Sequence, residues 1–142
     1  MNSIKDKVKL PSEALQHMVD GLRKKWVYVH METYGRSKDV FCFGCAATNA
    51  VCNIFEKSYN LESIDKREFR AKFFDLRRNE LLSFEWSIDK ARQGNLSGLM
   101  FFFDRWNYDE EYDNRFDLTT ANYEKELPKV EALISELKAD GL

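Results

Sequence analysis

The chain has 142 residues, of which 44% are hydrophobic and 14% aromatic, and its net charge is -2. This length is typical of one domain and is enough to bury a core without disulfides or metal. An isoelectric point near 5.8 argues against a nucleic-acid-binding protein, since values above about 9 are typical of that class. The charge is also uneven: residues 1–78 hold 15 basic and 10 acidic side chains, whereas residues 79–142 hold 7 and 14.

The composition also bears on the compartment. No stretch approaches the ~20 apolar residues that cross a bilayer, and the first nine residues lack the apolar centre of a secretory signal. The chain has three cysteines, and an odd number is typical of a protein whose thiols stay reduced. We therefore expect a cytoplasmic protein that does not associate with membranes.

The first predicted element follows a flexible segment over residues 1–10. Ser12 is a favourable N-cap for a helix over 12–25, and Glu13 lies near the positive end of its dipole. The apolar side chains that follow have helical spacing: Leu15, Met18, Val19 and Leu22.

Residues 26–31 are β-branched and aromatic, which favours a strand. Residues 39–43 could pair with it across a turn at 34–37, giving one short β-hairpin near residues 26–43, or they could instead begin the next helix. The helix over 45–55 carries no charge, so we expect it to be the central, mostly buried helix.

The second half of the chain adds further helical patterns. Amphipathic helices are predicted over 60–79 and 80–92, and a short apolar helix over 96–106, followed by a loop over 107–118. Pro128 suits the first position of the last helix, and Gly141 suits its end. The sequence thus predicts a mainly α fold: one compact bundle of five or six helices that spans residues 1–142.

The functional feature that we favour is an acidic and aromatic stretch within residues 99–117. Tyrosine and tryptophan beside charge are typical of binding hot spots, and acidic side chains attract a basic partner. The candidate surface consists of Trp106, Tyr108, Asp109, Glu110, Glu111, Tyr112 and Asp113. It favours a non-catalytic protein-binding domain, such as a small inhibitor, immunity-like or adaptor protein, whose partner has a basic surface.

The pair Cys42 and Cys45 offers an alternative, because a Cys-x-x-Cys pair at a helix start can be redox-active. Two buried thiols that act as small hydrophobic groups are the simpler interpretation. Zinc would also need Cys52 and His30, yet three thiols along one helix do not readily close a tetrahedron. We expect neither a metal nor a cofactor.

A third possibility is a small-ligand site beside the central helix, with Asn49 and Asn53 as polar anchors. Buried asparagines need hydrogen-bond partners, which a ligand or the protein itself could supply. Catalysis has weaker support, since nothing in the sequence places His17 or His30 beside a nucleophile. We therefore expect a protein that is not an enzyme.

Overall fold

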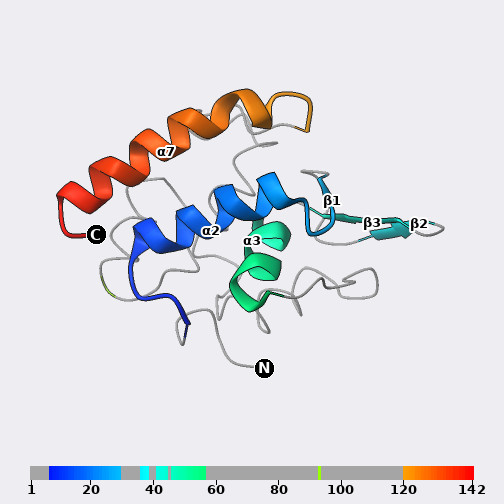
Figure 1. Cartoon of the computed structure of the whole chain (residues 1–142), viewed down its shortest axis with the longest axis horizontal. Helices are drawn as coiled ribbons and strands as arrows, with labels where there is room; N and C mark the ends of the chain where they lie inside the picture. The colour runs from blue at the N-terminus through cyan, green and yellow to red at the C-terminus, as the bar shows by residue number, and fades with distance from the viewer. Residues whose placement is uncertain (1–6, 30–35, 39–40, 45, 57–92, 94–119) are drawn as a thin grey trace.

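A computed structural model describes residues 7–29, 36–38, 41–44, 46–56, 93 and 120–142 of the chain (Figure 1). Most of these residues belong to three helices, and the remaining regular structure is a small sheet. The mainly helical character predicted from the sequence is confirmed for this part of the chain. The helices predicted over 60–79, 80–92 and 96–106 lie outside it.

Helix α2 (Pro11–Lys24) begins one residue earlier than the sequence suggested. Pro11 occupies the start, where its fixed φ suits a helix and its missing N–H is not needed. Leu10 is the N-cap residue, and it makes no side-chain capping bond. The expectation that Ser12 is the N-cap is therefore wrong. Its main-chain N–H and hydroxyl both donate to the main-chain oxygen of Leu142, at 3.1 and 3.0 Å.

Helix α7 (Tyr123–Ala139) contains Pro128 in its interior, so the expectation that Pro128 starts the last helix is also wrong. An internal proline costs roughly 3 kcal/mol, because it removes a main-chain hydrogen bond and crowds the preceding turn. The longer helix, however, buries Tyr123 and Leu127 on the same stripe as Val130. Each large apolar side chain contributes about 1.5–3 kcal/mol on burial, so two of them match or exceed the cost.

Gly141 ends α7 as predicted. It has a φ of +77°, a value that favours glycine, and its N–H donates to the oxygen of Lys138 at 3.1 Å. The N–H of Leu142 donates to the oxygen of Leu137 at 2.8 Å. These two bonds form a Schellman motif, which turns the chain so that Leu142 reaches the start of α2.

Helix α3 (Ala46–Phe55) is buried over residues 48–54, as its lack of charge predicted. It packs against α2 at Gly21, where main chain meets main chain. A Cβ added to Gly21 would lie 2.3 Å from the carbonyl oxygen of Asn49 and 3.2 Å from the nitrogen of Ala50. Only glycine therefore allows α2 to approach α3 this closely.

The small sheet follows α2 in the chain, and its strands have the order β1-β3-β2. Strand β1 (Tyr28–Val29) pairs with β3 (Phe41–Gly44) in parallel, and β2 (Arg36–Lys38) pairs with β3 antiparallel. The two segments expected to form a hairpin are thus neighbours, but their direction differs from the expectation. The polar segment assigned to the turn supplies the antiparallel strand, which leaves β1 to pair along the other side of β3.

Helix α2 lies between the two other described helices, with α7 along one side and α3 on the other (Figure 1). Its apolar face supplies the largest fully buried side chains of the described residues: Leu15, Met18 and Leu22. Val8, which precedes the helix, is buried as well. Among the described helices the central one is thus α2, and not α3 as the sequence led us to expect.

Candidate functional site

The residues singled out from the sequence fall into two groups. The acidic-aromatic surface, Trp106 to Asp113, and Cys45 lie outside the described residues, as does His30. Cys42 lies in β3 opposite Ser37, and only its main chain is described. Asn49 and Asn53 of α3 lie within the described residues, and both are buried.

Asn49 uses its side-chain oxygen to hold the chain that leaves α2. Its Oδ1 accepts a hydrogen bond from the main-chain N–H of Val27 at 3.3 Å. The Asn49 side chain is completely buried, so an unpaired amide there would cost roughly 1–3 kcal/mol. This bond fixes the start of β1 against α3.

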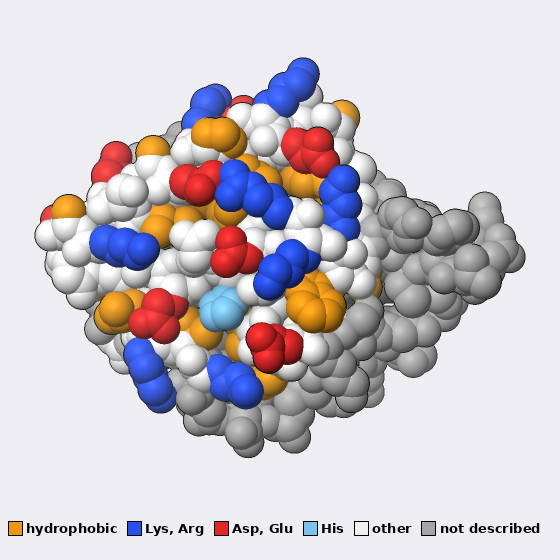
Figure 2. Space-filling view, viewed as in Figure 1, with side chains coloured by type: hydrophobic (Ala, Val, Ile, Leu, Met, Phe, Trp, Pro, Cys, Tyr) orange, Lys and Arg blue, Asp and Glu red, His pale blue; other side chains and the backbone are white. Residues whose placement is uncertain are grey.

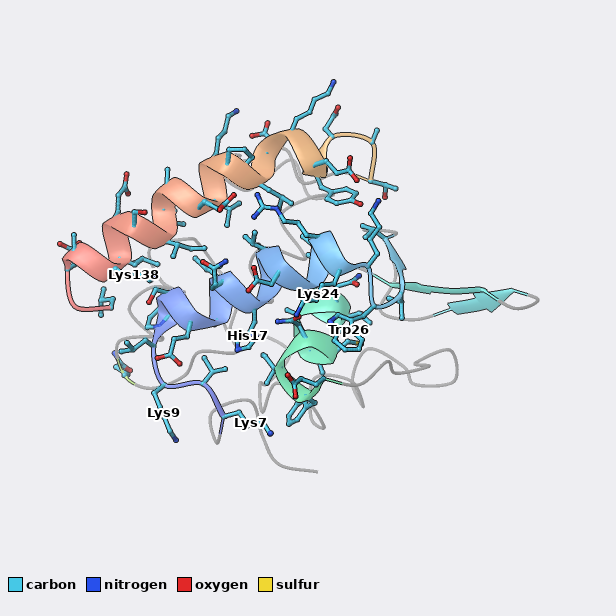
Figure 3. The ribbon with its side chains drawn as sticks, viewed as in Figure 1. Lys7, Lys9, His17, Lys24, Trp26 and Lys138 are labelled. Carbon is cyan, nitrogen blue, oxygen red and sulfur yellow. The ribbon has the colours of Figure 1, made fainter. Side chains whose placement is uncertain are left out.

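Asn53, one helical turn further along α3, binds two side chains that are distant in the sequence. Its Oδ1 accepts a hydrogen bond from the indole Nε1 of Trp26 at 3.0 Å. Its Nδ2 lies 2.8 Å from Nδ1 of His17. In Figure 3, His17 projects from the middle of α2 and Trp26 lies beyond its carboxyl end, both beside α3. We call the side chains of Asn49, Asn53, His17 and Trp26, with the N–H of Val27, the amide cluster.

The bonding pattern of the amide cluster determines which ring nitrogen of His17 carries the proton. An indole N–H can only donate, so Asn53 must turn its oxygen toward Trp26 and its NH2 group toward His17. An NH2 group also only donates, so Nδ1 of His17 must be an unprotonated acceptor. The imidazole is therefore neutral and carries its proton on Nε2.

The electrostatic setting of His17 favours the same state. Burial lowers the pKa of His17 below its ordinary value of 6.5, and this effect outweighs the opposing pull of Asp20 and Glu13. The side chain is only partly buried. The histidine visible in Figure 2 lies at the surface among acidic and basic side chains, so solvent protons reach it.

A second set of polar contacts joins α2 to α7 at the surface. Arg23 pairs with Glu131, and Nζ of Lys25 lies 3.1 Å from a carboxylate oxygen of Glu124. The hydrogen bonds from Lys25 and Arg23 lower the pKa values of Glu124 and Glu131, respectively. All four side chains are well exposed, so these pairs contribute little compared with burial.

The sequence identified the two asparagines but not their partners. Nothing in the sequence placed His17 beside a partner, and residues 26–31, which include Trp26, were expected to form a strand. One signal was available in the sequence. An uncharged helix carries two asparagines, and their amides need hydrogen-bond partners if they are buried. Nothing in the local pattern connects Asn53 with residues 27 and 36 positions away.

The described part of the chain contains neither a candidate metal site nor a candidate membrane-spanning helix. The Cys52 side chain is buried. The described residues contain no group of three or more His, Cys, Asp or Glu that could hold a metal ion. None of the described helices is both long and apolar enough to cross a membrane.

The sequence matches no family model, and no match is found among curated proteins or solved structures.

Proposed function

We propose that the chain is a non-catalytic protein-binding domain, a small inhibitor, immunity-like or adaptor protein, that captures a partner with a basic surface. The observation that carries the proposal is the sequence between Trp106 and Asp113, where three aromatic and four acidic side chains occur within eight residues. Rings that combine a large apolar area with a polar tip supply binding energy, and the carboxylates increase the rate of encounter.

The amide cluster supports this proposal over a small-ligand site on α3. The oxygen of Asn53 serves Trp26 and its nitrogen serves His17. Asn49 likewise holds Val27. A ligand anchored on these amides would have to displace bonds that position β1, so their burial has a structural explanation.

The proposal includes the finer architecture expected from the sequence. With the helices predicted over 60–79, 80–92 and 96–106, the three described helices would make six, within the expected bundle of five or six. The candidate surface would then begin at the end of the last of these predicted helices, with Trp106. An odd number of cysteines fits a reducing compartment, and the cytoplasm is the compartment that we propose.

Charge reversal tests the binding proposal. The double variant Glu110→Lys/Glu111→Lys should lose a partner that co-purifies with the wild-type chain from its own cells, as quantified by mass spectrometry. The matched control is Glu136→Lys/Asp140→Lys, which changes the net charge equally at exposed positions at the end of α7. Equal recovery of the partner by both variants would contradict the proposal, provided that their melting temperatures agree with that of the wild type.

A further inference from the structure

The amide cluster links a titratable side chain to the connection between α2 and β1. Trp26 and Val27 lie in this connection, and α3 holds them through two amides one helical turn apart. Asn53 is shared between Trp26 and His17, so the protonation state of His17 affects the hydrogen bond that Trp26 makes. His17 lies partly at the surface, whereas Asn53 is buried, with 6% of its surface exposed.

Protonation of His17 would break this arrangement. It places a second N–H on the ring at Nδ1, which then faces the NH2 group of Asn53, donor against donor. The amide can accept from the imidazolium only by rotating its oxygen toward His17. That rotation turns the NH2 group toward the indole N–H, and the bond to Trp26 is lost.

We propose that His17 and Asn53 form a pH-sensitive latch that keeps the indole N–H of Trp26 bonded to α3 only while His17 is neutral. The latch opens when a solvent proton reaches Nδ1. Asn49 continues to hold Val27, because its bond does not involve His17. The expected change is thus confined to the Trp26 side chain and the residues beside it.

The charges around His17 set the limits of this response. On α2, Glu13 and Asp20 favour the imidazolium and Lys24 opposes it, and Glu56, which follows α3, favours it. Burial has the largest effect and favours the neutral ring. The folded protein therefore takes up this proton at a lower pH than the unfolded chain, which takes it up near 6.5.

Nuclear magnetic resonance of the full chain tests the latch directly. The indole N–H resonance of Trp26, assigned with a Trp26→Phe variant, should shift between pH 8 and pH 5 with the same midpoint as the His17 ring. A His30→Gln variant assigns the two histidines. We expect a common midpoint below 6.5 and, at the acid end, weaker protection of the indole N–H against hydrogen exchange relative to its intrinsic rate at the same pH. An indole resonance that stays constant while His17 titrates would overturn the proposal.

Two variants separate the latch from a general effect of pH. Asn53→Asp offers a carboxylate that accepts from both the indole and the imidazolium, so the His17 midpoint should rise above 6.5 and Trp26 should stay bonded throughout. His17→Gln, at a partly exposed position, removes the titrating ring and should abolish the shift of Trp26. A shift that persists in His17→Gln would overturn the proposal even if Asn53→Asp does not fold.

Stability supplies an independent readout of the same group. Because the unfolded chain binds the proton more readily, the free energy of unfolding falls as the pH falls from about 6.5 toward the folded pKa of His17. Urea unfolding of the wild type should thus be easier at pH 5.5 than at pH 7.5, and less so for His17→Gln. Glu124 and Glu131, whose pKa values are lowered from 4.5, titrate mainly below this window. An equal pH dependence in both proteins would contradict the latch.

Discussion

The two sides of α2 are held in different ways. Toward α3, main chain meets main chain at Gly21, and buried amides bind specific groups. Toward α7, the partner helix offers a stripe of large apolar side chains, and the polar contacts are ion pairs at the exposed rim. The α3 side depends on the fit of individual atoms, whereas the α7 side depends on the area buried. Substitutions on the two sides should therefore have different consequences.

The largest effect is expected on the α7 side, from loss of apolar area. Leu127→Ala removes most of a side chain that is 2% exposed and leaves a cavity. We expect the free energy of unfolding to fall by about 2–5 kcal/mol, as measured by urea denaturation. Ala132→Gly, at an exposed position of the same helix, is the control and should cost at most about 1 kcal/mol. A similar loss in both variants would mean that helix propensity rather than burial holds α7.

Gly21→Ala tests the atomic fit on the α3 side. In an exposed helix this change stabilises by up to about 1 kcal/mol, because alanine is the better helix former. Here the new Cβ would lie 2.3 Å from the carbonyl oxygen of Asn49, so the helices must separate. We expect a loss of about 1–3 kcal/mol in urea denaturation. Lys24→Ala, at an exposed position of α2, should change stability by less than about 0.5 kcal/mol. A stabilising Gly21→Ala would show that α2 and α3 do not approach this closely.

The smallest effect should come from the rim of the α7 side. Arg23→Gln breaks the pair with Glu131, which is exposed and screened by salt. The melting temperature should drop slightly at low ionic strength, and the difference should vanish near 1 M salt. Lys129→Gln, which breaks a pair within α7 alone, is the matched control. A large loss that persists in high salt would place this pair among the main contacts of the interface.

Local patterns in the sequence were sufficient for features that depend on neighbouring residues. The spacing of apolar side chains predicted α2, the lack of charge predicted the burial of α3, and Gly141 predicted the end of α7. Each of these features is fixed within one or two helical turns. Ser12 and Pro128 were misplaced because distant contacts, the oxygen of Leu142 and the burial of Tyr123, decide their roles.

The same distinction between neighbouring and distant residues applies to the candidate site. A buried asparagine can be suspected from an uncharged helix, but its partners depend on how that helix meets the rest of the fold. Trp26 and His17 reach Asn53 from 27 and 36 residues away. Strand pairing behaves in the same way, since β1 pairs with the edge of β3 that β2 does not occupy.

The bonds between Ser12 and Leu142 join groups 130 residues apart in the chain. Closing so long a loop costs chain entropy before the contact gives any stabilisation in return. We therefore expect the contacts between α2 and α7 to form late in the folding reaction, after α2 and α3 have met over a much shorter separation. Substitutions at Ser12 should accordingly accelerate unfolding and leave the folding rate nearly unchanged, the behaviour of a residue with a φ-value near zero.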